Sequence, residues 1–170
     1  MSDTSQGLID QVLARIPRGR YLMTSHFEGA RAGILVDSAM WLMESPLLIG
    51  VSVQKGHEID PLIRDSRSFA IGFISDDDKF ITRRFSPRLN SAESAIHVEG
   101  MDPFETLQST PIVTGSPTLS QCDLWLDCEV LRRVDLENAQ EFFVGSVVGI
   151  KVGSEIVHIE QDVDMSSDED

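Results

Sequence analysis

The chain contains 170 residues, of which 41% are hydrophobic, and its 28 acidic side chains against 14 Lys and Arg give a formal net charge of −14. A chain of this length buries roughly two-thirds of its unfolded surface, so it can form one core without disulfides or a structural metal. The excess of negative charge argues against a surface that binds nucleic acid or the anionic face of a membrane, because both need clustered Lys and Arg.

The first segment of the chain predicts a short helix. Thr4 or Ser5 can cap its N-terminus, and Pro17 with Gly19 ends it. The apolar face of this helix consists of Leu8, Val12, Leu13 and Ile16.

The period of the pattern then becomes that of strands. Residues 21–27 and 32–42 are extended segments on either side of Glu28-Gly29-Ala30, a turn signal, and together they predict a β-hairpin. Residues 47–53 are entered through Pro46, are rich in β-branched and apolar side chains, and predict a third strand.

Two further short helices are expected in the middle of the chain. Asp60-Pro61 has the pattern of an N-cap followed by proline at the first helical position, within residues 55–67. After a predicted buried strand over residues 69–74, three consecutive aspartates at 76–78 are expected to cap a helix over residues 79–85.

The second half of the chain contains a long irregular stretch and then long strands. Residues 86–118 carry irregularly spaced Pro and Gly, which predicts a surface excursion of the kind that often contributes to a site. Residues 124–134 and 142–152 predict two strands joined around residues 135–138, and residues 156–159 predict a last short strand. Six or seven strands interrupted by short helices predict an all-β dominated fold with short α-helices, a small closed barrel.

We expect one domain over residues 1–160 and an acidic, disordered tail over residues 161–170. Six of the last eleven residues are acidic, and without them 22 acids against 14 bases leave a net charge of −8. No apolar run approaches the ~20 residues of a membrane-spanning helix, and the opening MSDTSQG lacks the order of a signal peptide. We therefore expect a cytoplasmic protein.

The two cysteines are expected to be free thiols. Cys122 and Cys128 lie six residues apart in one predicted strand, which separates them by about 20 Å at ~3.3 Å per residue, beyond the ~7 Å limit for a disulfide. The alternation around Cys128 is typical of a half-buried small hydrophobic residue rather than a reactive thiol.

Several chemistries have no motif in the sequence. The four histidines are far apart and have no Cys or carboxylate at ligand spacing, so no metal site is expected. There is no G-x-S-x-G elbow for acyl transfer and no G-x-G-x-x-G dinucleotide motif. The four histidines are His26, His57, His97 and His158.

A series of short motifs in unbroken order carries a family resemblance. The opening strand GRYLMTS is followed by RAGILVDSAMWLMESPLLIGVSV, which is close to the pattern A-G-x-T-x-N-S-F-x-S-x-S-x-x-P-P-L-V. Next come LIRDSRSFAIGF, FITRRF, TGSPTLSQCDLWLDCEV and FFVGSVVGIKV. From Arg18 to Val152 the chain resembles the flavin-reductase-like, FMN-binding split-barrel family.

The resemblance implies a six-stranded Greek-key split barrel that forms homodimers with FMN at the subunit interface. It places residues 31–46 and the loop after the third strand against the cofactor. The residues that agree with the pattern are Ala32, Gly33, Ser38, Pro46 and Gly145, and Lys55 keeps a cation at a position that is often basic. The departures are Leu35, Asp37, Ala39, Trp41, His57, Ile59 and Gln140. The expected cofactor-binding set is Leu35, Val36, Asp37, Ser38, Ala39, Trp41, Ser52, Lys55, His57 and Arg83.

Two features of this set have more than one interpretation. Trp41 is either an aromatic wall beside the flavin ring or an anchor of the barrel or the dimer interface. Arg83 and Arg84 either hold a phosphate or are solvated and paired with nearby acids.

The leading hypothesis is a flavin reductase-like oxidoreductase in which FMN, or less favourably FAD, takes a hydride from NADH or NADPH. Such chemistry requires no catalytic side chain, so none is assigned. The reduced flavin can serve a partner such as a monooxygenase. The alternative is a divergent barrel that has lost tight flavin binding, its site closed by Leu35, Trp41 and Ile59, and that acts as a ligand-binding or protein-interaction module.

Overall fold

The computed structural model describes residues 3–75, 77–86 and 102–160, with side chains from residue 6 onward. The helices are α1 (Asp3–Leu13), α2 (Ile59–Ser66) and α3 (Lys79–Phe85). The strands are β1 (Tyr21–Phe27), β2 (Ala30–Val36), β3 (Ala39–Met43), β4 (Leu48–Gln54), β5 (Ser68–Phe73), β6 (Ser109–Thr110), β7 (Thr118–Leu119), β8 (Leu124–Asp135), β9 (Gln140–Val152) and β10 (Glu155–His158). The predicted acidic tail over residues 161–170 lies outside the described residues.

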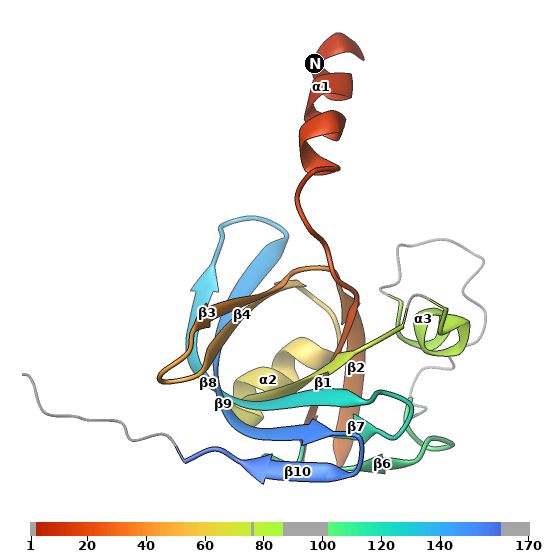
Figure 1. The fold of residues 1–170 in the computed structure, drawn as a ribbon, viewed down its shortest axis with the longest axis vertical. Helices are drawn as coiled ribbons and strands as arrows, with labels where there is room; N and C mark the ends of the chain where they lie inside the picture. Colours follow the sequence, from red (N-terminus) through yellow and green to blue (C-terminus); the bar gives the residue numbers. More distant parts are fainter. Residues whose placement is uncertain (1–2, 76, 87–101, 161–170) are drawn as a thin grey trace, which may run out of the picture.

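One antiparallel sheet forms the body of the molecule. Its strand order is β2-β1-β5-β8-β9-β4-β3, with β10 added to β9, and β6 pairs with β7 separately. The two end strands of this path, β2 and β3, are consecutive in the chain and meet at Asp37–Ser38, so the sheet curls into a barrel (Figure 1). The predicted β-dominated barrel class is confirmed, with seven strands on the path rather than six.

Strands β1 and β5 are buried on both faces, and this explains their continuous apolar runs. Side chains alternate across a strand, so Met23 faces the barrel interior while its neighbour Leu22 faces outward. The interior cluster includes Val51, Phe69 and Phe143. The outer cluster is built around Trp125 and is covered by α3 and by the segment from Asp102 to Cys122.

The two predicted hairpins are present. Strands β1 and β2 pair from Tyr21–Val36 to Phe27–Ala30 around a two-residue turn, and β8 and β9 form the long hairpin of the sheet. The predicted second strand over residues 32–42 is broken, however, into β2 and β3. The chain turns at Asp37–Ser38 because β2 pairs with β1 whereas β3 pairs with β4 on the other side of the barrel.

The starts of the short helices are partly as predicted. Asp78 caps α3 and its carboxylate accepts a hydrogen bond from the Ile81 N–H at 3.0 Å, as expected. The predicted cap at Asp60 is wrong, since α2 begins at Ile59 and Pro61 is its third residue. Nδ1 of His57 accepts the Ile59 N–H at 3.2 Å, which allows the helix to start earlier.

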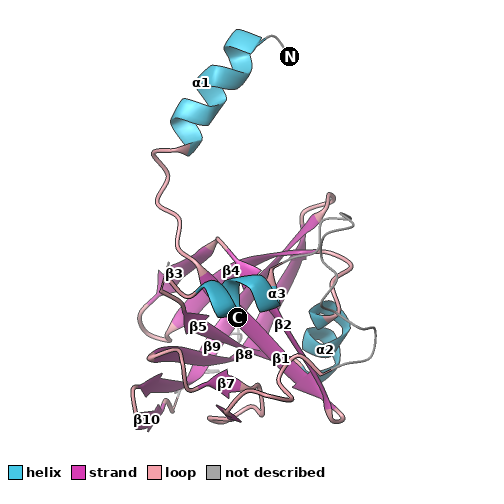
Figure 2. Ribbon diagram, turned by 90° about the vertical axis from the view of Figure 1, so that its right-hand side faces the viewer, coloured by secondary structure: helices cyan, strands magenta, loops and turns pink. Residues whose placement is uncertain are grey.

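The N-terminal helix α1 stands away from the barrel on an extended linker (Figures 1 and 2). Thr4 and Ser5 lie inside it rather than capping it, because α1 already begins at Asp3. Its apolar face has no partner among the described residues, and Leu8 and Val12 are 60% and 63% exposed.

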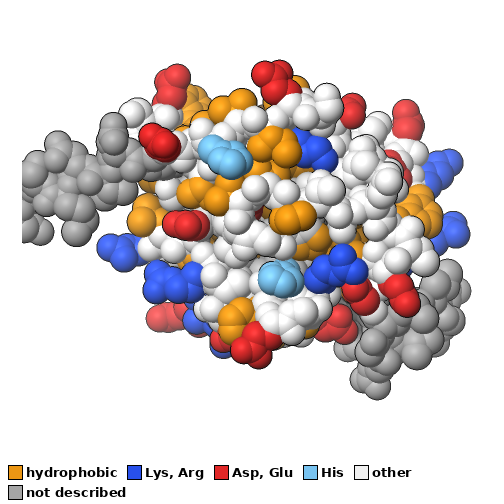
Figure 3. Space-filling model, turned by 90° about the horizontal axis from the view of Figure 1, so that it is seen from below, with side chains coloured by type: hydrophobic (Ala, Val, Ile, Leu, Met, Phe, Trp, Pro, Cys, Tyr) orange, Lys and Arg blue, Asp and Glu red, His pale blue; other side chains and the backbone are white. Residues whose placement is uncertain are grey.

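Exposed apolar side chains also lie on β3, where Trp41 is 69% exposed. The face seen from below in Figure 3 shows scattered hydrophobic side chains mixed with acidic, basic and histidine side chains. None of the described helices is long and apolar enough to cross a bilayer.

Both cysteines are free and buried. Cys122 lies before β8, and Cys128 lies within it. Cys128 is completely buried in the barrel interior, whereas the sequence predicted a half-buried residue.

Candidate functional site

A polar cleft opens where the turn after β4 faces the end of α3. It encloses about 200 Å³. Its walls come from segments far apart in the chain, namely β2, the turn from β4 into α2, the end of α3, and the segment that follows residue 101. The lining residues are Gly33, Gln54, Lys55, Gly56, His57, Glu58, Arg84, Phe85, Ser86 and Pro103.

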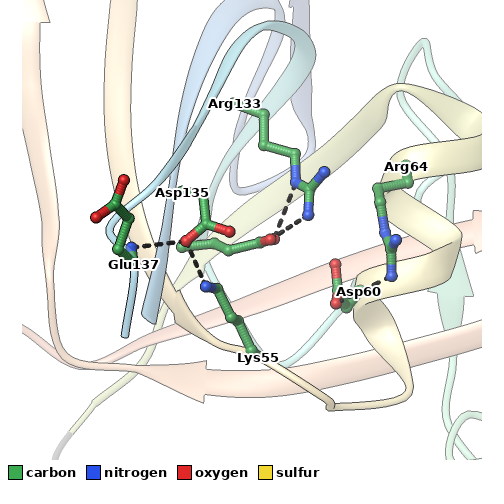
Figure 4. Close-up of polar contacts among 7 residues, drawn as sticks. Lys55, Asp60, Arg64, Arg133, Asp135 and Glu137 are labelled. Carbon is green, nitrogen blue, oxygen red and sulfur yellow. Dashed lines mark hydrogen bonds and ion pairs between the residues drawn. The ribbon is translucent and has the colours of Figure 1, made fainter. Parts of the chain in front are cut away.

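Lys55 is held at one side of this cleft by the β8–β9 hairpin (Figure 4). Its N–H donates to the Ala139 carbonyl at 2.9 Å, and its ammonium group forms an ion pair with Asp135. Asp135 also accepts the Glu137 N–H at 2.7 Å. The hydrogen bond from Lys55, followed by that from Glu137, lowers the pKa of Asp135. The charge of Lys55 is therefore partly compensated before any ligand binds.

A second ion pair joins the two strands of the same hairpin. Arg133 contacts both carboxylate oxygens of Glu141, with 3.1 Å from Nε to Oε2 (Figure 4). The Glu141 side chain is only 4% exposed, so this two-point contact neutralises a buried charge. The hydrogen bond to Glu141 raises the pKa of Arg133. The hairpin that holds Lys55 thus carries a buried ion pair of its own.

The turn that leads into α2 contributes two backbone N–H groups to the lining of the cleft. Glu58 is the N-cap residue, but its side chain makes no capping hydrogen bond. Within the part of the chain that the structure describes, the N–H groups of Gly56 and Glu58 have no acceptor. Unpaired N–H groups at the positive end of a helix dipole favour an anion such as a phosphate.

The opposite wall of the cleft is the C-terminal end of α3. Nε of Arg84 donates to the Pro103 carbonyl at 2.6 Å, and its guanidinium lies 5.8 Å from the centre of the Phe80 ring. Phe85 packs directly over Gly33, since a Cβ at Gly33 would lie 2.8 Å from the ring. The position of Arg84 therefore depends on the absence of a side chain at Gly33.

The segment that contributes Pro103 is itself anchored to the barrel. Arg31 forms an ion pair with Asp102 and also donates to the Ser109 hydroxyl at 3.3 Å. Its guanidinium lies 5.5 Å from the centre of the Phe104 ring. These contacts fix the outer rim of the cleft relative to β2.

The structure brings together only part of the predicted cofactor set. Lys55 and His57 line the cleft, whereas Arg83 is exposed and its neighbour Arg84 takes the place beside the cleft. Ser52 donates to the Gln140 side chain at 3.2 Å. Asp37 lines a second cavity near the start of β1, and Ser38 is exposed beside it.

The other predicted residues lie elsewhere. Val36 is buried in the interior and Ala39 packs against that interior cluster, so neither side chain faces the cleft. Leu35 packs on the outer cluster, Ile59 is fully buried, and Trp41 is exposed on β3. Leu35, Trp41 and Ile59 thus lie in three different environments, and none of them lines this cleft.

Residues of the cleft that the sequence did not single out include Gln54, Gly56 and Pro103. They carry no motif, and their role depends on the contact of α3 with β2. Arg84 was predicted in part, because the Arg83-Arg84 pair at the end of the predicted helix was interpreted either as a phosphate site or as solvated side chains paired with nearby acids.

Comparison with known proteins agrees with this architecture. The sequence model described as the flavin reductase like domain matches residues 13–162. The chain belongs to this family. The match covers most of the chain, including the cleft, the β1–β2 and β8–β9 hairpins and the break between β2 and β3.

Solved structures share this fold at low sequence identity. The NADH:FAD oxidoreductase of Streptomyces globisporus is 17% identical, with a TM-score of 0.69 over 94% of this chain and 96% of that one. The flavin reductase PheA2 is 19% identical, with a TM-score of 0.66 over 95% and 100% of the two chains. Component B of nitrilotriacetate monooxygenase from Mycobacterium thermoresistibile is 20% identical, with a TM-score of 0.68 over 98% and 93%.

Among curated proteins, a protein described as a diflavin flavoprotein of Synechocystis is 27% identical over 131 residues. The match covers 75% of this chain but 21% of that protein. The chain therefore corresponds to one portion of these longer relatives.

Proposed function

We propose that this protein is a flavin reductase-like oxidoreductase that binds FMN with its phosphate in the cleft formed by β2, the β4–α2 turn and α3. The observation that carries the proposal is the convergence of unpaired amide donors at the start of α2 with Lys55 and Arg84, in a chain of this family.

The donors of the cleft fit a phosphate. The N–H groups of Gly56 and Glu58 need no particular side chain, and Lys55 and Arg84 add positive charge. Glu58 and the Asp135 partner of Lys55 offset part of that charge, so we expect moderate rather than very tight binding.

The cleft is too small for a whole flavin. Its volume of about 200 Å³ is below the roughly 300–1,000 Å³ of usual ligand pockets. We therefore place only the phosphate end there and the ring over the exposed break at Asp37–Ser38, where backbone groups of Ser38 and Ala39 would hold its polar edge. When bound, the flavin supplies the capacity to accept a hydride from NADH or NADPH. The protein's own residues orient the two reactants and exclude water.

A homodimer would complete the site. The exposed apolar residues of β3 are typical of an interface, and they follow the break where we place the ring. They are Met40, Trp41, Leu42 and Met43. In this arrangement Trp41 anchors the second copy. Analytical ultracentrifugation of the wild type and of Trp41→Asp tests the dimer. We expect the wild type to sediment as a dimer and Trp41→Asp as a monomer, and a monomeric wild type would contradict the proposal.

The reduced product would serve a partner. Because component B of a monooxygenase has this fold, a flavin-consuming monooxygenase is the partner class we propose.

Titration of FMN fluorescence tests the cofactor site. We expect a dissociation constant in the micromolar range for wild type and a loss of affinity of about tenfold for Arg84→Gln, because one charge-assisted hydrogen bond contributes about 1.5–3 kcal/mol. Arg83→Gln is the matched control, since Arg83 lies on the same helix outside the cleft, and it should bind FMN as wild type does.

The outcome also separates the proposal from the alternative module. Failure of wild type to bind FMN at near-millimolar concentration would refute the enzyme function. The observation that favours the non-enzymatic alternative is the ion pair of Lys55 with Asp135, because it reduces the positive charge that the cleft offers to a phosphate.

A further inference from the structure

A second cavity lies outside the cleft, between the linker that follows α1, the start of β1 and the ends of β2 and β5. Its volume is about 590 Å³, within the usual range for small-molecule sites. The lining residues are Arg18, Gly19, Arg20, Tyr21, Asp37, Phe73, Ile74 and Ser75.

Two arginines at this cavity are not engaged by acidic side chains. Neither Arg18 nor Arg20 forms an ion pair within the described ranges, although the chain carries twice as many acids as bases. The backbone beside them is fixed, because the Arg20 carbonyl accepts the Ile74 N–H at 3.3 Å. Two unpaired guanidinium groups on an anchored segment are suited to a phosphorylated ligand.

The cavity also offers an aromatic surface. Phe73 is 40% exposed, and its ring meets the edge of Tyr21 with centroids 5.2 Å apart at an interplanar angle of 83°. Gly19 lets the linker pass close to Tyr21, since a Cβ there would lie 2.2 Å from the Tyr21 hydroxyl. A planar ring can therefore lie against Phe73 next to the two arginines.

Asp37 connects this cavity to the site of the proposed reaction. It lies at the break between β2 and β3, directly before Ser38, and Tyr21 pairs with Val36 at the same end of β2. An exposed carboxylate beside two arginines repels additional phosphate but accepts hydrogen bonds from hydroxyl groups, such as those of a ribose.

We propose that this cavity binds the adenosine diphosphate half of the nicotinamide co-substrate, with Arg18 and Arg20 on its phosphates, Asp37 on its ribose and Phe73 against its base. This inference rests on the proposed flavin reductase function, because it extends the same reaction site from the break at Asp37–Ser38 to the linker. The chemistry recognised is that of a purine nucleoside diphosphate.

Calorimetric titration of the full chain with ADP, without flavin, tests the cavity directly. We expect wild type to bind ADP, and the double variant Arg18→Gln/Arg20→Gln to lose affinity by at least tenfold, as the removal of charge-assisted contacts to phosphate requires. Arg15→Gln is the matched control, because Arg15 precedes the same linker but does not line the cavity, and it should bind ADP as wild type does. Absence of ADP binding at 5 mM, or equal binding by the double variant, would overturn the inference.

Kinetics separate this inference from the proposed function. With FMN present, the double variant should show a KM for NADH raised about tenfold, whereas reduced nicotinamide mononucleotide, which lacks the ADP half, should be oxidised equally by both proteins. NADH oxidation by wild type together with an unchanged KM in the double variant would refute the inference and leave the proposed function standing. Arginine-dependent ADP binding without any FMN binding would refute the proposed function and support the cavity as a nucleotide site.

Discussion

Replacing Asp127 with alanine should destabilise the barrel strongly, because this buried carboxylate holds a loop over its outer face. The side chain is completely buried and accepts the Val113 N–H at 2.7 Å and the Thr114 N–H at 2.8 Å on one oxygen. The Thr114 hydroxyl donates to the other oxygen at 2.6 Å. Alanine would leave all three donors without this acceptor.

The size of the effect follows from these contacts. Each buried backbone N–H that is left without an acceptor lowers the free energy of unfolding by about 1–3 kcal/mol. Removing the buried charge of Asp127 restores part of this free energy. We expect a net decrease of about 3–5 kcal/mol in the free energy of unfolding, a large share of the ~5–15 kcal/mol typical of a domain. With an m value of about 2 kcal/mol per molar, the urea midpoint should fall by about 2 M.

Urea unfolding monitored by tryptophan fluorescence is a suitable assay. Trp125 is fully buried two residues before Asp127 and donates to the Leu119 carbonyl at 3.0 Å, so its emission reports the packing of this face. A Trp41→Phe background leaves Trp125 as the one tryptophan of the chain, so the emission then reports this face alone.

Asp127→Asn is the matched control. Its amide oxygen can accept both N–H groups while its NH₂ group donates to the Thr114 hydroxyl oxygen, so we expect less than half the loss seen with alanine. Burial raises the pKa of Asp127 above its ordinary value of 3.8, which means that the folded state binds this proton more tightly than the unfolded state does. Wild type should therefore gain stability relative to Asp127→Asn as the pH falls through the raised pKa. An alanine variant within 1 kcal/mol of wild type, or an asparagine variant as unstable as alanine, would refute the reasoning.

Three further results are expected. Gly33→Val should push Phe85 and α3 outward, lower the free energy of unfolding by about 1–3 kcal/mol, and weaken FMN binding in the fluorescence titration; an unchanged affinity would show that α3 does not form the cleft wall. Burial, followed by nearby acidic groups, raises the pKa of Cys122 to about 11, and burial raises that of Cys128 well above its usual value, so Ellman's reagent at pH 8 should react with both thiols only after unfolding. Because its lysine partner lowers the pKa of Asp135, the stabilisation measured against Asp135→Asn should be present above pH 3.8 and disappear as the pH falls through the lowered value; a difference that persists in acid would contradict the role of the ion pair.

The sequence was enough to locate the hairpins of the sheet, but not the break between β2 and β3. The alternation of apolar and polar residues located the long hairpin of β8 and β9, and the turn signal at Glu28-Gly29 located that of β1 and β2. The break at Asp37–Ser38 was missed because residues 32–42 form one extended stretch locally, and only the different pairing partners of β2 and β3 divide it.

Residues of the candidate site were predictable only where their place follows from the strand next to them in the sequence. Lys55 and His57 follow β4 directly, so their place at its end was predictable from the sequence. The choice of Arg84 over Arg83 was not, because it depends on the docking of Phe85 over Gly33. The separation of Leu35, Trp41 and Ile59 into three environments likewise depends on which face of each element meets the core.

The sequence by itself determined the class of the fold, since period-two patterns and turn residues act over a few neighbouring positions. Only the tertiary structure decided the two cavities, because their walls come from segments distant in sequence that meet after the sheet curls. Gly33 and Pro103 in the cleft, and Arg18 and Phe73 in the second cavity, become neighbours only when long-range strand pairing has placed them.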